Sequence, residues 1–187
     1  MSKGIAQTEG PQLVVKPFVR LGSFQLGAQW KNVSSAIADG EGAAFVSVSP
    51  KLGEFQLGLS VAHKFQTRVR EPTDDHSWEF TGSVTRRFGK LGLRVLAVYS
   101  PDDLGSAKRS LFVEAIPMLE LGKTTHLSAG IGRRSRVNGD DYTAFHAGVA
   151  KSIFEGVTVD ARWYDTNRSG LGSAYQRRVV ISARMAF

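Results

Sequence analysis

The sequence predicts an all-β protein: a single closed, antiparallel, up-and-down transmembrane β-barrel of about twelve strands, the first one truncated. Three observations predict this fold. Apolar residues recur at every second position along most of the chain, a short glycine-containing unit repeats, and tight connections alternate with long polar ones. The 187 residues suit one domain, 1–187, because domains usually contain about 100–200 residues.

Alternation of apolar side chains marks the strands. Residues 55–62 read FQLGLSVA, with an apolar side chain at every odd position. The pattern recurs in residues 157–164 and 178–187, and less cleanly in 93–100. Successive side chains of a strand point to opposite faces, so each segment is predicted to be a strand with one apolar face.

A repeated unit sets the spacing of the strands. The segment LGSFQLG at 21–27 recurs as LGEFQLG at 52–58, with a weaker echo, FGKLGL, at 88–93. The spacing of roughly thirty residues fits two strands, a tight turn and a longer loop. We therefore expect a hairpin as the repeating module, in which glycine supplies the positive φ of the tight turn.

These patterns predict the elements in order. After a stub at about 1–5, strands are expected at 12–21, 24–32, 43–50, 54–65, 77–88, 91–100, 110–119, 125–133, 142–153, 156–165 and 175–187. Short connections are expected at 22–23, 51–53, 89–90, 120–124 and 154–155. Longer polar ones are expected at 33–42, 66–76, 101–109, 134–141 and 166–174. Because every second connection is tight, neighbouring strands pair antiparallel and one rim carries all the long loops.

The facing of the strands favours a membrane barrel over a soluble barrel or sandwich. Closure removes the two exposed edges that an open sheet would have. One face carries long charged side chains that suit a wet interior, and strands of about ten residues can cross a bilayer when tilted. Aromatic residues gather at both ends of the strands, as at the two interfaces of a membrane. They are Trp30, Phe65, Trp78, Tyr99, Tyr142, Trp163 and Tyr175 toward the long loops, and Phe24, Phe55, Phe88, Phe154 and Phe187 toward the short turns.

The C-terminus indicates the membrane. Ile181, Ala183, Met185 and Phe187 alternate at the end of the chain and resemble the C-terminal strand by which the barrel assembly machinery recognises bacterial outer-membrane barrels. With Phe187 in the periplasm, the short turns fall on the periplasmic side and the long loops outside. The expected localisation is the outer membrane of a Gram-negative bacterium, with its lipid and lipopolysaccharide as partners.

Four segments resemble one porin family. Ser2–Pro11 is similar to the family's S-x-G-I-S-Q-T-x-x-x-P stretch, and Tyr99–Asp102 matches its Y-S-P-D. Gly148–Ile153 resembles its G-V-S-K-S-F, and Trp163–Thr166 its Y-x-D-T. In this order along the chain, the segments resemble the TorF-type porins, a proteobacterial family also called Gcw-chp.

The resemblance implies an outer-membrane β-barrel, perhaps twelve-stranded, with no settled substrate. In the family, the S-x-G-I segment ends a first strand that follows a signal peptide. Here no apolar stretch of signal-peptide length follows Met1. We therefore expect the natural precursor to carry a signal peptide and the rest of strand one upstream, which the closing strand 175–187 would otherwise lack as a partner.

No catalytic, metal or cofactor site is expected. The chain has no cysteine, which excludes disulfides, cysteine–zinc sites and thiol nucleophiles. His126 and His146 share the wet face of neighbouring strands, but a metal would need further ligands close by. Ser128 and Ser152 lie near them in sequence without a G-x-S-x-G elbow, so a lipid hydrolase is a minor alternative. Basic clusters without a recognition motif do not indicate nucleic-acid binding.

Charge is the strongest functional signal. Lys and Arg number 24 against 17 Asp and Glu, which favours anionic neighbours. Alternation assigns Lys16, Arg20, Lys31, Lys64, Arg87, Arg94, Arg162, Arg178 and Arg184 to the lumen, against Glu79, Glu114 and Asp160. Lys64 is expected to pair with Glu79, and Arg178 with Asp160. The surplus predicts a porin for small polar, anionic solutes. The alternative is a plugged, non-conducting barrel with a structural or lipopolysaccharide-contact role.

Overall fold

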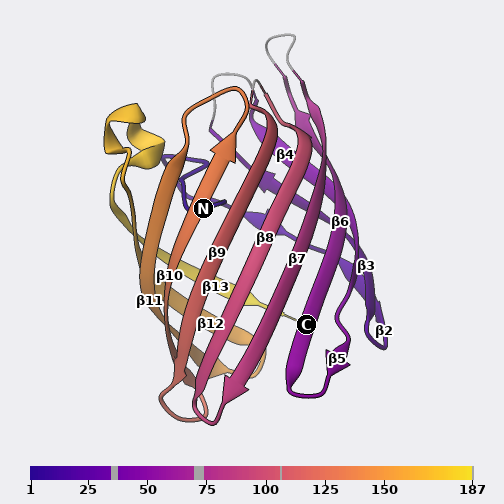
Figure 1. Ribbon diagram of the computed structural model, residues 1–187, viewed down its shortest axis with the longest axis vertical. Helices are drawn as coiled ribbons and strands as arrows, with labels where there is room; N and C mark the ends of the chain where they lie inside the picture. Colours follow the sequence, from indigo (N-terminus) through magenta and orange to yellow (C-terminus); the bar gives the residue numbers. More distant parts are fainter. Residues whose placement is uncertain (35–37, 70–73, 106, 187) are drawn as a thin grey trace.

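The computed structural model describes residues 1–34, 38–69, 74–105 and 107–186, and it confirms the all-β, up-and-down fold. Thirteen strands form one sheet in which every pair is antiparallel and each strand pairs with strands no more than two places away in sequence order (Figure 1). No helix in the described part of the chain has the length and hydropathy needed to cross a bilayer. The ribbon curls into a barrel around a central bore.

The strands have the following bounds: β1 Val14–Val15, β2 Phe18–Leu21, β3 Phe24–Asn32, β4 Gly40–Val48, β5 Lys51–Leu52, β6 Phe55–Thr67, β7 His76–Phe88, β8 Leu91–Asp103, β9 Lys108–Glu120, β10 Thr125–Arg136, β11 Tyr142–Phe154, β12 Val157–Thr166 and β13 Arg178–Met185. Two short 3₁₀ turns, η1 Ser169–Leu171 and η2 Ser173–Tyr175, lie between β12 and β13.

Proline divides two of the predicted strands. Pro17 separates β1 from β2, which both pair with β3, and Pro50 separates β4 from β5, which both pair with β6. Proline has no N–H to donate, so it interrupts a ladder where it stands. The thirteen assigned strands therefore form eleven runs across the wall.

The connections divide between the two rims as the alternation predicts. The tight turns after β2, β5 and β7 contain Gly22, Gly53 and Gly89, whose φ values are 60°, 58° and 61°. The long loops lie together at the opposite rim (Figure 1). The N–H of Ala186 donates to Gly156 O at 2.9 Å, so the chain ends beside a tight turn. Phe187 itself lies outside the described residues.

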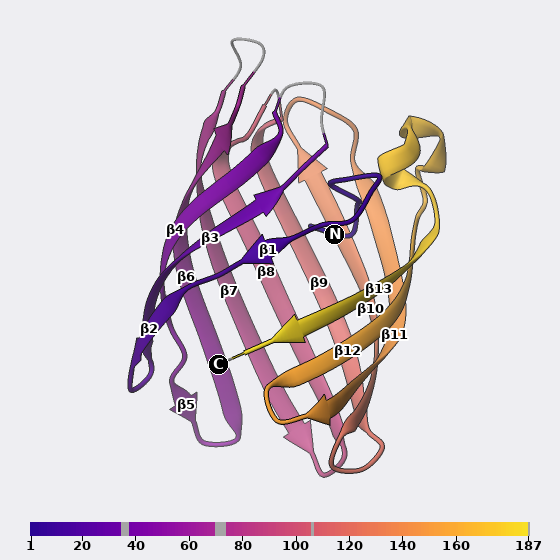
Figure 2. The same ribbon diagram turned by 180° about the vertical axis from the view of Figure 1, so that it is seen from behind.

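The hydrogen-bonded path has two free ends. Among the described residues, β13 pairs only with β12, and β1 and β2 pair only with β3. The two ends face each other across a seam in the wall (Figure 2). Because the runs alternate in direction and their number is odd, β13 and the β1–β2 run point the same way.

Residues 1–5 differ from the predicted strand stub. Ser2 and Ile5 exchange two backbone hydrogen bonds of 2.9 and 3.0 Å, which closes a tight turn. Lys3 and Gly4 occupy its centre with φ values of 48° and 80°, as a type I′ turn requires. The turn packs against the inner side of β11, where the Tyr142 hydroxyl donates to Lys3 O, and the N-terminus is seen in the opening between β1 and β13 (Figure 2).

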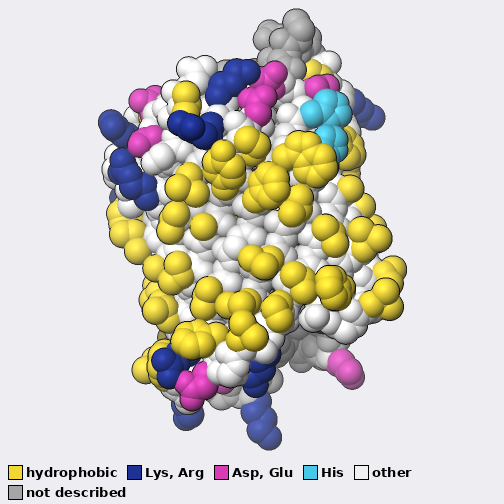
Figure 3. Space-filling model, turned by 45° about the vertical axis from the view of Figure 1, so that its right-hand side comes forward, with side chains coloured by type: hydrophobic (Ala, Val, Ile, Leu, Met, Phe, Trp, Pro, Cys, Tyr) yellow, Lys and Arg dark blue, Asp and Glu magenta, His cyan; other side chains and the backbone are white. Residues whose placement is uncertain are grey.

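Apolar side chains cover the outside of the wall, between charged side chains at the two rims (Figure 3). Leu59 is 54% exposed, Val95 42% and Ile181 76%, which is expected where lipid takes the place of a core. Trp30, Trp78 and Trp163 are exposed toward the long loops, and Phe24, Phe55 and Phe88 toward the short turns.

Two aromatic residues do not belong to the predicted belt. Tyr142 faces inward and is fully buried, and Tyr175 packs against its ring edge-on at 5.3 Å between centroids. Tyr142 begins β11 on the same face as His146, so alternation turns its ring into the bore.

We expect Leu59→Arg to reduce the free energy of unfolding by about 2–4 kcal/mol, because the guanidinium would enter hydrocarbon. Ser60→Arg is the matched control, because Ser60 is next in sequence and lines the inner cavity. Urea unfolding in lipid vesicles measures both variants. Equal losses would contradict the assigned facing.

Candidate functional site

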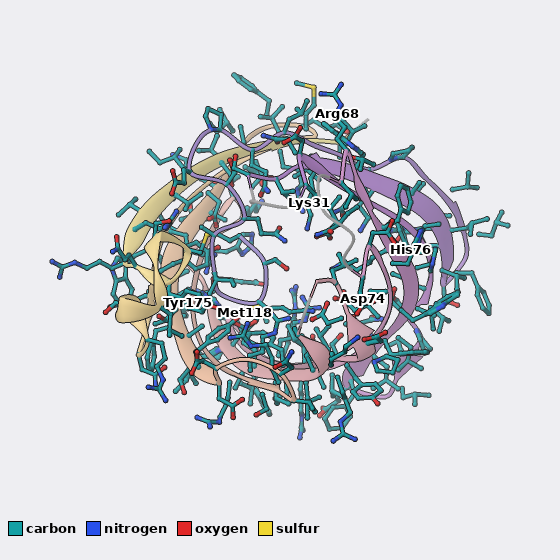
Figure 4. The ribbon with its side chains drawn as sticks, turned by 90° about the horizontal axis from the view of Figure 1, so that it is seen from above. Lys31, Arg68, Asp74, His76, Met118 and Tyr175 are labelled. Carbon is teal, nitrogen blue, oxygen red and sulfur yellow. The ribbon has the colours of Figure 1, made fainter. Side chains whose placement is uncertain are left out.

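The inner face of the barrel carries most of the charged strand residues. Lys31 and Lys64 line a cavity of about 520 Å³, and Lys31 lies inside the ring of strands in Figure 4. Residues paired across antiparallel strands share a face, so the register extends this assignment around the wall. It places on the inner face Lys16, Arg20, Lys31, Lys64, Arg87, Arg94, Arg162, Arg178 and Arg184, together with Glu79, Glu114 and Asp160.

Near the long loops, inward charges alternate in sign from strand to strand. The carboxylate of Glu41 on β4 forms salt bridges with Lys31 Nζ of β3 at 2.9 Å and with Lys64 Nζ of β6 at 3.2 Å. Lys64 also reaches Glu79 of β7 at 3.4 Å, the pair that the sequence predicts. All but Glu79, at 20%, have side chains no more than 10% exposed. These pairs link four neighbouring strands.

The chain of charges continues through the N-terminal turn. Lys3 Nζ lies 2.9 Å from Glu79 and 3.1 Å from Asp103 on β8. Asp103 also accepts from the guanidinium of Arg134 on β10 and, at 2.7 Å, from the hydroxyl of Ser110. We call the seven charged residues the outer-rim ion network: Lys3, Lys31, Glu41, Lys64, Glu79, Asp103 and Arg134.

A second cluster lies deeper, on β9, β11 and β12. His146 is held between Glu114, at 3.1 Å from Nε2, and the guanidinium of Arg162, at 2.8 Å from Nδ1. A guanidinium only donates, so Nδ1 accepts, and the proton of neutral His146 sits on Nε2 and is donated to Glu114. Arg162 also donates to Asp160 at 2.9 Å, which leaves it little freedom to bind a solute.

Arg178 does not pair with Asp160 as expected. The register pairs Arg178 with Tyr164, and Asp160 with Ser182. The two charged residues are thus offset by four residues, or about 13 Å along the strands. Arg178 instead donates to the backbone carbonyls of Ser173 and Gln176. Asp160 forms its salt bridge with Arg162, which lies on the same strand and face.

An N-terminal segment, Met1–Pro11, crosses the bore. Its turn reaches β11, where the Tyr142 hydroxyl donates to Lys3 O at 2.7 Å. Farther on, Gln7 accepts from Lys31 at 2.8 Å on the opposite part of the wall. In the view from above, a part of the backbone lies inside the ring of strands (Figure 4). Met1 and Ser2 line both the cavity of about 520 Å³ and a second one of about 300 Å³.

Sequence reasoning missed four members of the ion network. Glu41, Asp103 and Arg134 fell in predicted loops, but β4, β8 and β10 extend past the predicted strand ends and carry them inward. Asp103 follows a register shift after Ser100, next to Pro101, so simple parity would not have placed it. No sequence pattern around Lys3 predicts that it lies in the bore.

His126 and His146 are the inward histidines that the sequence offers as candidates for a catalytic or metal site. They contain no cluster of three or more metal-ligating side chains. His146 bonds Glu114 and Arg162 but no serine, and His126 lies on the inner face of β10 opposite Glu120. A serine hydrolase would need a hydroxyl within hydrogen-bond reach of one of these imidazoles.

At the long-loop rim, the basic run at 133–136 divides between the two faces. Arg134 points inward to Asp103, whereas Arg133 points outward and lies 3.2 Å from Asp141. A hydrogen bond from the backbone N–H of Arg136 lowers the pKa of the Asp141 carboxyl, which favours its ionised form. Only part of the basic run therefore faces the surroundings of the barrel.

The expected assembly signal lies on the outer face of β13. Ile181 and Met185 are 76% and 67% exposed, and Ala183 shares their parity. Recognition by the assembly machinery stays a prediction, and its terminal residue, Phe187, lies outside the described residues.

We expect Glu41→Gln to reduce the free energy of unfolding by about 2 kcal/mol, because Lys31 loses its carboxylate and Lys64 one of two. Glu54→Gln is the control, because that carboxylate is 70% exposed and pairs with Arg86 at a tight turn. It should cost less than about 0.5 kcal/mol. Equal effects in urea unfolding would show that the network adds no stability.

Comparisons with known proteins identify the fold. No protein-family description matches the sequence, and no curated protein does. Among solved structures, the NanC porin superposes with a TM-score of 0.70 at 8% identity, over 94% of this chain and 92% of that one. The KdgM porin gives 0.68 at 8% identity, over 94% and 91%. A loop-deletion mutant of OmpT, an outer-membrane protein of Vibrio cholerae, gives 0.57 at 14% identity, over 92% and 62%. The chain has the β-barrel fold of outer-membrane porins.

Proposed function

We propose that the protein is a channel of the bacterial outer membrane for small polar solutes, with a preference for anions. The porin-type fold and the apolar outer wall support the location and the channel role. The charge balance of the bore supports the preference for anions.

One observation carries this preference: the inward acids of the strands are paired, and several inward bases are not. Five described inward carboxylates have a cationic partner: Glu41 with Lys31, Glu79 with Lys64, Asp103 with Arg134, Glu120 with Arg87, and Asp160 with Arg162. The sixth, Glu114, accepts a hydrogen bond from His146. Within the described part of the chain, no salt bridge joins a carboxylate to Lys16, Arg20, Arg94 or Arg184. The unpaired charge facing the bore is therefore positive.

These unpaired cations lie mainly in the half of the bore nearer the short turns. Arg94 lies three residues past Leu91, the first residue of β8 after the tight β7–β8 turn. Arg184 is opposite Thr158, the second residue of β12 after the tight β11–β12 turn. Lys16 lies farther up, with its ammonium 4.5 Å from the ring centre of Phe45. Inward Arg and Lys residues attract anions and repel cations in a pore.

A plugged, non-conducting barrel is the second candidate. The N-terminal segment crosses the bore, and Lys3 is held there by two carboxylates. A bore closed by this segment would carry no current, and the protein would then serve a structural role in the membrane.

The reversal potential of purified protein in a planar bilayer, under a KCl gradient, tests the proposal. We expect a potential displaced toward that of chloride, and a smaller displacement in the variant carrying Arg94→Gln and Arg184→Gln. Arg162→Gln should matter less, because Arg162 is already bound to Asp160 and His146.

Lys151→Gln is the matched control. Lys151 pairs with Val159, one position along β12 from the partner of Arg184, but it faces outward. Its replacement removes a positive charge at a similar height and should leave the selectivity unchanged. Cation preference in the unmodified protein would overturn the anionic assignment, and absence of current would favour the plugged barrel.

A further inference from the structure

We infer that Met1–Pro11 is a releasable constriction, and that Lys3 determines how large a solute can pass. The inference rests on the proposed channel function. It assigns the size limit to a segment inside the bore and not to the barrel wall.

The segment presents Lys3 at the tip of a tight turn. The Ser2–Ile5 hydrogen bonds close the turn, and its two central residues have positive φ. Because these two bonds pair Ser2 with Ile5 inside the turn, it keeps its shape without a strand partner, and Tyr142 supplies a donor to Lys3 O. The Lys3 side chain is only 8% exposed and projects to β7 and β8.

Isolated contacts spread along the segment hold it, including the Lys3 ion pairs, a bond from the Ser34 N–H to Gln7 O and one from the Ser173 hydroxyl to Glu9, and within the described part of the chain no strand ladder does. The Ala6 N–H donates to Ala174 O at 3.1 Å, and the Tyr142 hydroxyl bonds Lys3 O. Gln7 meets Lys31, and the Thr8 hydroxyl lies 2.9 Å from that of Ser34. These are side-chain bonds and single backbone bonds, unlike the continuous ladders of the wall.

The partners of Lys3 remain satisfied when it leaves. Glu79 keeps Lys64 at 3.4 Å, and Asp103 keeps Ser110 and Arg134. A buried carboxylate without a partner would oppose release, and release creates none. The freed ammonium would pass into the water of the bore, where it is hydrated. Lys3 therefore forms a latch that can open without disrupting the wall.

The segment also separates the two inner cavities. Residues Met1 and Ser2 line both, with Gln29 and Lys31 on one side and Phe112 and His146 on the other. Moving the segment aside would join spaces of about 520 and 300 Å³. A joined bore would conduct better and admit larger solutes.

A disulfide tests both the position and the effect of the segment. The sequence has no cysteine, so Ala6→Cys with Ala174→Cys introduces a single possible pair. The Ala6–Ala174 backbone hydrogen bond keeps the two residues within disulfide range. We expect the bond to form on oxidation and to hold the channel in its low-conductance state, which reduction reverses. Each single-cysteine variant is the control for the oxidant.

Lys3→Gln tests the latch without a cross-link. We expect at least about a twofold rise in single-channel conductance, because the turn loses both ion pairs that hold it in the constriction. Lys151→Gln is the control, because it removes a lysine charge from the outer face of the wall. It should leave the single-channel conductance unchanged.

The outcomes distinguish the two proposals. Failure of the disulfide to form, or equal conductance in its oxidised and reduced states together with an unaltered Lys3→Gln channel, would overturn the constriction and leave the channel function intact. Absence of current in every form, with the disulfide formed, would overturn the proposed channel function and the constriction with it.

Discussion

The outer-rim ion network is the interaction on which the inside of the barrel depends. A wall that turns its apolar side chains outward has little apolar material left to pack within, and few apolar side chains are fully buried. Charges alternate in sign across β3, β4, β6 and β7, and Lys3 of the N-terminal turn bridges the carboxylates of β7 and β8, the second of which also binds Arg134 of β10. Because each carboxylate serves two cations, losing one contact leaves a second one in place.

The bore consequently has two electrostatic regions. Near the long loops, opposite charges are matched and the N-terminal segment takes part in the matching through Lys3. Nearer the short turns, no salt bridge in the described part of the chain joins Arg94 or Arg184 to a carboxylate. The balanced region thus lies near the long loops and the positive one nearer the short turns.

Alternation in the sequence predicted the wall well and the bore only in part. Period two fixes which side chains share a face, so Leu59 and Ile181 are outside and the tight turns share one rim. Charge pairing needs strand register as well, and a four-residue offset separates Arg178 from Asp160. Asp103 lies beyond a register shift, and Lys3 docks through contacts with residues more than seventy positions away. Such contacts leave no local pattern in a sequence.

The odd number of runs has a consequence for topology. Since β13 and the β1–β2 run point from the long-loop rim toward the short-turn rim, their edges cannot join in the antiparallel manner of the rest of the wall. Any segment that bonded both edges in that manner would have to run in the opposite direction, from the short-turn rim to the long-loop rim. One such segment would make the number of runs even, so that all neighbours could pair antiparallel, and two would make it odd again. The seam thus selects both the direction and the number of the strands that it could accept.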